Sequence, residues 1–298
     1  MSTVKTEEHP PQHVPVLLDA TLELLQPKKG ESYLDLTAGY GGHASAFLEK
    51  TGNYVDSCLV DRDQNAIDSL QPLALKGVRL LHGDFLRAAE QLVAEEAKFD
   101  MILVDLGVSS PQLDKAERGF SFMREGQLDM RMDQTQRETA ETYINTVSRP
   151  ELAEAITRYG EERPRVAKRY ADAIVSARPL HTTTELAEVI KQAHVGGWQS
   201  IHPATRTFQA IRIVINHELE QIERLLPLVP ALLRPQGRVG VISFHSLEDR
   251  LVKRFFLDQA RSGYEAELAL VHKKPISGTN DDHNPRARSA KLRVAVKK

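Results

Sequence analysis

The sequence predicts an α/β protein with a doubly wound, mostly parallel sheet that is interrupted by a helical insertion. Three observations support this fold class: a strand, glycine turn and helix near the start, alternating short apolar runs and amphipathic segments, and a middle third without strand patterns. The chain has 298 residues, 41% hydrophobic and 27% charged, which is ordinary for a globular protein with room for two domains.

The first strand, turn and helix lie between Tyr33 and Lys50. Apolar Tyr33, Leu34 and Leu36 predict the strand, and residues 44–50 predict the helix. The turn between them holds three glycines, which let the backbone approach a ligand closely: Gly39, Gly41 and Gly42. This arrangement is typical of a nucleotide-cofactor site.

Two carboxylates indicate which cofactor the turn binds. The glycines, with Ala44, also fit the G-x-G-x-x-G/A pattern of dinucleotide sites. Asp35, at the strand end, would repel a pyrophosphate and suits a cation instead. S-adenosylmethionine carries an ammonium and a sulfonium, and Asp61, after the apolar run 54–60, could accept from its ribose hydroxyls. We therefore favour S-adenosylmethionine; a nicotinamide cofactor and a ligand-free structural turn stay open as alternatives.

Composition excludes several classes of protein. No apolar run approaches the roughly 18 residues of a membrane span, and residues 1–12 lack the apolar core of a signal peptide. We expect residues 1–12 to be a mobile leader and the protein to stay in the cytoplasm. Cys58, the single cysteine, lies in a strand pattern and is expected in the core. No metal site is predicted.

Further strands and helices of the sheet domain follow in alternation. Apolar runs predict strands over 55–60, 78–81, 101–104, 237–244, 268–271 and 292–296, and helices over 16–25, 64–75, 208–226 and 251–257. Asp84 and Phe85 end a strand at the same edge as Gly39 and Asp61, because ligands collect beyond the carboxyl ends of parallel strands. These two residues are candidates for accepting the adenine amine and packing on the base; an ordinary loop acid beside a core phenylalanine is the alternative.

Residues 113–202 carry no strong strand pattern and predict a mostly helical insertion. Helices are expected over 151–159, 161–176 and 185–193, the last opened by a capping box from Thr182 to Glu185. The Met-, Phe- and Arg-rich stretches 118–122 and 128–133 have no helical period and suggest a contact surface. The predicted domains are residues 13–112 with 203–298 for the cofactor, and 113–202 for recognition of a partner.

Charge is balanced overall but clustered locally. The net charge is only −2, yet residues 286–298 hold six cations and no acid, and residues 163–169 form a second basic cluster. A solvated tail or helix face is the favoured explanation of each cluster when it is taken singly.

Seven long motifs occur in order along almost the whole chain. They are Gly41-Gly-His43, Asp105-Leu-Gly-Val-Ser-Ser-Pro-Gln-Leu-Asp114, Arg118-Gly-Phe-Ser-Phe122, Leu128-Asp-Met-Arg-Met-Asp133, His202-Pro-Ala-Thr-Arg-Thr-Phe-Gln-Ala210, Ile242-Ser-Phe-His-Ser-Leu-Glu-Asp-Arg250 and Asn284-Pro-Arg-Ala-Arg-Ser-Ala290. With them, the sequence from His13 to Arg293 closely resembles the RsmH (MraW) family of bacterial 16S rRNA cytidine N4-methyltransferases. The resemblance implies a class I S-adenosylmethionine-dependent methyltransferase fold, Rossmann-like and doubly wound.

The resemblance also implies site residues and partners. It assigns cofactor contacts to Gly41, Gly42, His43, Asp61, Phe85, Asp105 and Gln112. It implies 16S rRNA within the small ribosomal subunit as the partner; the expectation of no membrane and no metal comes from the composition. The sequence departs from the family at Gln127, Ala44 and Ala20, which concern loop rigidity and a helix start rather than the cofactor acids. The sequence does not reveal whether the protein forms a homo-oligomer.

The sequence also offers candidates for the residues that touch cytosine. Many amino-methylating enzymes carry Asp/Asn-Pro-Pro-aromatic after the fourth strand, whereas this chain has Asp105-Leu-Gly-Val without an aromatic residue. We therefore predict that Ser110 or His245, which follow strands bordering the cofactor site, contacts the target base. Arg286, Arg288 and Lys291 are predicted to contact RNA phosphates.

Two other classes of function remain compatible with the sequence. A small-molecule methyltransferase would share residues 39–84, but it has no need of the basic tail or the insertion. A non-catalytic RNA-binding or ribosome-assembly module would bind RNA regardless of S-adenosylmethionine.

Overall fold

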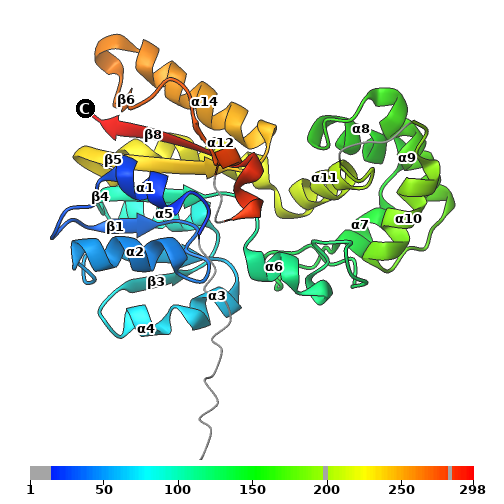
Figure 1. Cartoon of the computed structure of the whole chain (residues 1–298), viewed down its shortest axis with the longest axis horizontal. Helices are drawn as coiled ribbons and strands as arrows, with labels where there is room; N and C mark the ends of the chain where they lie inside the picture. The colour runs from blue at the N-terminus through cyan, green and yellow to red at the C-terminus, as the bar shows by residue number, and fades with distance from the viewer. Residues whose placement is uncertain (1–14, 197–200, 281–283) are drawn as a thin grey trace, which may run out of the picture.

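The computed structural model describes residues 15–196, 201–280 and 284–298, which form a sheet domain and a helical unit beside it (Figure 1). The predicted mobile leader, residues 1–12, lies outside the described residues. Within the described ranges, no helix has the length and apolar character needed to cross a membrane.

One sheet of eight strands forms the centre of the sheet domain. Its order is β3-β2-β1-β4-β5-β8-β6, with β7 also paired to β8. The first five strands in this order are mutually parallel, whereas β8 runs antiparallel to its neighbours. The strands are β1 (Tyr33–Asp35), β2 (Cys58–Asp61), β3 (Arg79–His82), β4 (Phe99–Asp105), β5 (Leu233–Ser243), β6 (Leu268–Leu270), β7 (Ile276–Ser277) and β8 (Lys291–Lys297).

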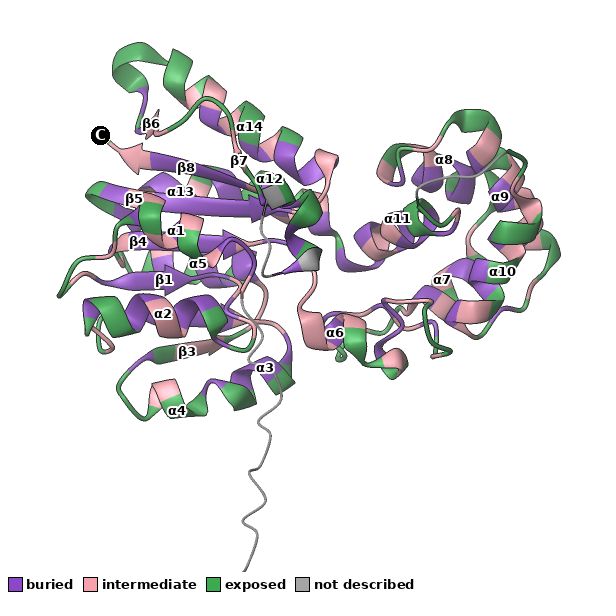
Figure 2. Cartoon of the chain, in the orientation of Figure 1, coloured by how far each residue is buried: buried purple, intermediate pink, exposed green. Residues whose placement is uncertain are grey.

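Helices cover both faces of this sheet, and the alternation of side chains along the strands explains why. Ile102 and Val104 of β4 point into one core with α5, α12, α13 and α14, whereas Met101 and Leu103 point into the other with α1 and α2. Figure 2 shows the central strands β1, β4 and β5 as mostly buried. The helices of this domain are α1 (Leu18–Leu25), α2 (Gly42–Thr51), α3 (Gln64–Ser69), α4 (Gln71–Ala74), α5 (Phe85–Ala94), α12 (Glu218–Leu225), α13 (Val229–Leu232) and α14 (Ser246–Arg261).

The helical unit has a separate core. Its buried residues come from the loop 118–139 and from five helices that pack on one another. The capping box at Thr182 and Glu185 is present, as predicted. The helices are α7 (Ala140–Thr146), α8 (Arg149–Tyr159), α9 (Pro164–Ser176), α10 (Thr183–Ala193) and α11 (Thr205–Asn216); the short α6 (Ser110–Asp114) leads into the unit.

The predicted single helix over 208–226 is wrong. His217 adopts a left-handed conformation with φ +51°, which ends α11 and begins α12. Phe208, Ile211 and Ile215 bury their side chains in the helical unit, whereas Ile222 lies in the sheet core. The predicted domain boundary at residue 203 therefore shifts, because α11 belongs to the core of the helical unit.

The stretches 118–122 and 128–133 are not the exposed contact surface that their composition suggested. Phe120, Leu128, Met130 and Met132 are all buried in the core of the helical unit. Loop residues without a helical period thus fill part of this core, and flexible Met side chains suit such irregular packing.

Candidate active site

A large cavity opens between the carboxyl edge of the sheet and the helical unit. Its volume is about 1560 Å³. The turns after β1, β2, β4 and β5 line one side, and α6 and α11 line the other. Most residues predicted for the site meet here: Gly39, Gly41, Gly42, His43, Asp61, Phe85, Asp105, Ser110, Gln112, His245, Arg286 and Arg288 all line the cavity.

The glycine turn after β1 is held against the end of β2. The Gly39 N–H donates to Asp61 Oδ2 at 2.7 Å, and the Asp63 N–H donates to Asp61 Oδ1 at 2.8 Å. Gly41 has φ +82°, and a Cβ on Gly42 would lie 2.5 Å from Pro15 Cγ. Side chains are therefore excluded from this turn by conformation and by close packing.

Three carboxyl groups gather at the ends of β1, β2 and β4. Burial raises the pKa of Asp35 to about 7 and also raises the pKa of Asp61. Burial, followed by repulsion from Asp35, raises the pKa of Asp105 well above its usual range. Asp105 Oδ1 is buried and has no hydrogen-bond partner in the described structure. A cluster of this kind favours a cationic ligand, which would stabilise the ionised carboxylates.

His43 lies at the start of α2 beside this cluster. Its Nε2 is 3.0 Å from the Val16 carbonyl oxygen, and its Nδ1 is 3.7 Å from Asp105 Oδ2. Burial lowers the pKa of His43 to about 4, so the imidazole is neutral at pH 7. His43 thus connects the segment before α1 to the floor of the cavity without adding charge.

A buried ion pair joins the β2 turn to the helical unit. Arg118 Nη1 donates to Asp63 Oδ2 at 2.6 Å, and both side chains are only 4% exposed. Gln112 Nε2 donates to the same oxygen at 3.1 Å. Burial opposes ionisation of Asp63, but the hydrogen bonds from Arg118 and Gln112 prevail and lower its pKa. The predicted cofactor residue Gln112 therefore also positions the turn that carries Asp61.

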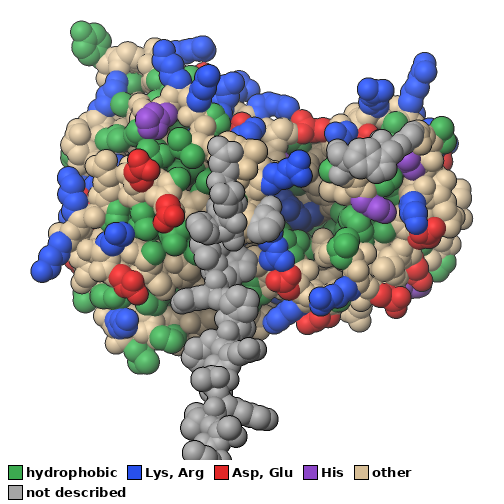
Figure 3. Space-filling model, in the orientation of Figure 1, with side chains coloured by type: hydrophobic (Ala, Val, Ile, Leu, Met, Phe, Trp, Pro, Cys, Tyr) green, Lys and Arg blue, Asp and Glu red, His purple; other side chains and the backbone are tan. Residues whose placement is uncertain are grey.

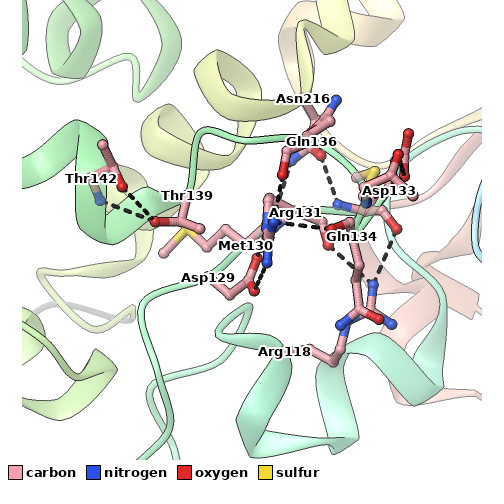
Figure 4. Close-up of polar contacts among 12 residues, drawn as sticks. Arg118, Asp129, Met130, Arg131, Asp133, Gln134, Gln136, Thr139, Thr142 and Asn216 are labelled. Atoms are coloured by element: carbon pink, nitrogen blue, oxygen red, sulfur yellow. Dashed lines mark hydrogen bonds and ion pairs between the residues drawn. The ribbon is translucent and has the colours of Figure 1, made fainter.

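The same arginine anchors the loop 128–133, as Figure 4 shows. Arg118 Nη2 donates to the carbonyl oxygens of Arg131 and Met132. Asn216, at the end of α11, accepts from the Met132 N–H at 2.9 Å and donates to the Met130 oxygen at 2.8 Å. The loop is thereby fixed to both the cavity wall and α11.

The cavity wall formed by α11, α12 and the start of α14 contains a second group of charged side chains. Glu248 Oε2 accepts from the Phe244 N–H at 2.7 Å, and its Oε1 lies 3.2 Å from His245 Nε2. Burial disfavours ionised Glu248, but His245 and Arg212 hold its pKa below the usual value. Ligand atoms of Glu218, His245 and Glu248 lie within 4.8 Å of one another, a spacing that could hold a metal ion. Arg212 donates to both Glu218 oxygens at 2.8 Å, so a guanidinium already supplies the positive charge there.

Three predicted site residues do not line the cavity. Asp35 is buried behind the turn, where it accepts from the Tyr33 hydroxyl and the Thr37 N–H. Asp84 caps α5 by accepting from the Arg87 N–H at 2.9 Å. Lys291 is 3.2 Å from Asp249. We therefore assign to Asp35 and Asp84 support of the site rather than ligand contact, and to Lys291 a structural ion pair.

Several residues that line the cavity were not predicted from the sequence. Asp63, Arg212, Glu218 and Glu248 line the cavity, but none belongs to a cofactor pattern. A signal for Glu248 was present, because it stands three residues after His245 and completes a capping box. This capping box is hard to recognise in the sequence because its N-cap residue is His245 rather than the usual Ser or Thr.

The sheet has the strand order 3-2-1-4-5-8-6 with one antiparallel strand inserted near the edge, and a cavity lies at the carboxyl ends of the parallel strands. These features define a class I S-adenosylmethionine-dependent methyltransferase. Comparison with protein families gives a narrower assignment. Residues 11–298 match the model described as the MraW methylase family. The chain belongs to this family.

Two similar proteins carry the same name. "Ribosomal RNA small subunit methyltransferase H" of Magnetococcus marinus is 46% identical over 96% of this chain and 98% of that protein. The protein of the same name from Koribacter versatilis is 44% identical over 96% and 94%. Among solved structures, a putative rRNA methylase from Clostridium thermocellum is 11% identical, covers 96% and 99%, and has a TM-score of 0.46.

Proposed function

We propose that this chain transfers a methyl group from S-adenosylmethionine to the exocyclic N4 of a cytidine in the decoding region of small-subunit ribosomal RNA. The size and composition of the cavity support this proposal most strongly. Ligand sites are commonly about 300–1,000 Å³, whereas this cavity is about 1560 Å³. It has room for a cofactor and for a nucleotide that has left its stack.

The side of the cavity at the glycine turn fits the cofactor. Gly39, Gly41 and Gly42 allow close backbone approach, and Asp61 supplies a carboxylate for ribose hydroxyls. Phe85, only 8% exposed, offers an apolar surface to the adenine. The unpartnered Asp105 Oδ1 and the neighbouring acids complement the cationic end of S-adenosylmethionine.

S-adenosylmethionine supplies a methyl group on a sulfonium, which is already a good leaving group. The protein therefore has to orient N4 toward the methyl carbon and exclude water. Asp105, Ser110 and His245 lie around the same cavity and are the candidates to hold the cytosine amine. An acceptor on that amine localises its lone pair and receives the proton that N4 loses.

The helical unit and the cavity rim support an RNA substrate. Arg286 and Arg288 line the cavity mouth and are exposed, although Arg286 also pairs with Asp114 at 2.5 Å. The relatives' printed name refers to small-subunit ribosomal RNA. Because ribosomal subunits are assembled in the cytoplasm, the proposal includes a cytoplasmic location.

Calorimetry and methyl transfer test the proposal together. Wild-type protein should bind S-adenosylmethionine and transfer labelled methyl to small subunits from cells that lack this gene. Asp61→Ala should lose both, whereas Asp56→Ala, an exposed acid before β2, should retain both.

Transfer to free nucleotides or metabolites instead of subunits would contradict the proposal in favour of a small-molecule methyltransferase. RNA binding that is indifferent to S-adenosylmethionine, without any transfer, would favour a non-catalytic assembly module.

A further inference from the structure

The outward face of α14 carries an unusual concentration of positive charge. Arg250, Lys253, Arg254 and Arg261 are all exposed and line a shallow groove of about 260 Å³ with Leu257 and Asp258. Residues three, four, seven and eleven positions apart share one helix face. Figure 3 shows Lys and Arg side chains along the upper edge of the sheet domain, where α14 lies in Figure 1.

The acids of this helix do not neutralise the face. Glu248 and Asp249 point inward and are buried, and Asp249 pairs with Lys291 and Arg293 of β8. Among the described residues that line the groove, Asp258 is the one acid, and it lies 3.8 Å from Arg254. Within the described part of the chain, no ion pair engages Lys253 or Arg261.

The basic face begins at the active-site cavity. His245 and Glu248, which line the cavity, lie at the first turn of α14. Arg250 is 3.0 Å from Glu161 of the helical unit, so the first cation stands where the two parts of the protein meet. The helix then leads away from the cavity over about 16 Å, from Arg250 to Arg261, at ~1.5 Å per residue.

We propose that this face, the α14 stripe formed by Arg250, Lys253, Arg254 and Arg261, binds the phosphodiester backbone of the RNA substrate beside the target nucleotide. This inference rests on the proposed function. A strand with one negative charge per nucleotide matches a row of cations on a rigid helix, and phosphate contacts fix register without reading sequence. The stripe would hold the strand while the cavity receives the base.

A triple variant tests this inference: Lys253→Gln, Arg254→Gln and Arg261→Gln. All three side chains are exposed, so folding should be unaffected. Each phosphate contact contributes about 0.7 to the salt slope of single-stranded binding, so the slope of log affinity against log salt should fall by about 2. We expect KM for small subunits to rise about tenfold or more, while kcat and affinity for S-adenosylmethionine stay unchanged.

A matched control removes three exposed cations from a different part of the sheet domain: Lys28→Gln, Lys29→Gln and Lys50→Gln. These residues are exposed and lie near the start of β1 and the end of α2, and none of the three lines the cavity. They should leave the salt slope and KM at wild-type values. An equal effect in both variants would show a general charge effect and overturn the inference.

Comparing two forms of the substrate shows whether the α14 stripe binds RNA or a ribosomal protein. Binding is measured both to intact subunits and to a protein-free RNA fragment that contains the target. Weakened binding to both supports the stripe as an RNA surface. Weakened binding to subunits alone would show that the stripe contacts an acidic ribosomal protein, which overturns the inference. If wild-type protein methylates subunits and the triple variant matches it, only this inference fails; if wild-type protein transfers no methyl, the proposed function itself fails.

Discussion

Replacing Arg118 with methionine should destabilise the protein by about 3 kcal/mol. The change leaves Asp63, which is 4% exposed, as a buried carboxylate without its cation. Breaking a buried pair by removing one partner costs about 3–5 kcal/mol. We take the lower end, because Gln112 Nε2 and the Asn65 N–H still donate to Asp63. Urea unfolding at pH 7 measures the loss.

The pH dependence of the same variant is a second readout. The folded pKa of Asp63 is lowered, so its contribution to stability is present above the unfolded pKa and is lost as pH falls through the folded value. The difference between wild type and Arg118→Met should therefore shrink below about pH 4. Affinity for S-adenosylmethionine should also fall, because the Asp63 N–H holds the Asp61 carboxylate.

Arg79→Met is the matched control. Arg79 pairs with Glu95 at the surface, with side chains 43% and 38% exposed. Exposed pairs contribute about 0–1 kcal/mol. If Arg118→Met costs no more than this control, or if its deficit persists unchanged in acid, the interpretation of Arg118 as a buried anchor is refuted.

Three further predictions concern the same site. Wild type should lose about 3 kcal/mol of stability as pH falls from 6.5 toward 4, because burial lowers the pKa of His43 to about 4 and only the unfolded state takes up the proton. His43→Gln should not show this loss, and a pH profile equal to that of wild type would contradict this explanation. Affinity for S-adenosylmethionine should rise with pH, and its binding should release protons, because a cation favours ionised Asp105. Calorimetry in buffers of different ionisation enthalpy measures the number of protons released, which should be smaller for Asp105→Asn than for wild type. Asn216→Leu should leave the Met132 N–H and the Met130 carbonyl oxygen without their hydrogen-bond partner, which should destabilise the protein by about 1–3 kcal/mol for each group. Hydrogen exchange over residues 128–133 should accelerate, and protection equal to that of wild type would refute the role of Asn216 in holding this loop.

The sheet and the cofactor turn could be predicted because their signals are local. Alternating apolar residues such as Met101 to Val104 serve the two opposite cores of a covered sheet. Gly41 and Gly42 stand where conformation or packing excludes other residues. A strand, a turn and a helix each need only a few consecutive residues to be recognised.

The missed features depend on residues far apart in the sequence. The amphipathic period continues through His217, and only the three-dimensional arrangement shows that Ile215 and Ile222 enter different cores. Arg118 and Asp63 are separated by 55 positions, so no local pattern reveals that they meet. Met130 and Met132 fill a core from a loop, where burial leaves no period to detect.

The central claim is methyl transfer to N4 of a cytidine in small-subunit RNA. Mass spectrometry of nucleosides from small subunits that lack this modification, after incubation with the protein and labelled S-adenosylmethionine, tests it most directly. We expect labelled N4-methylcytidine with wild-type protein and none with Asp61→Ala. Label on a different atom, on a different nucleoside or on no nucleoside would contradict the claim.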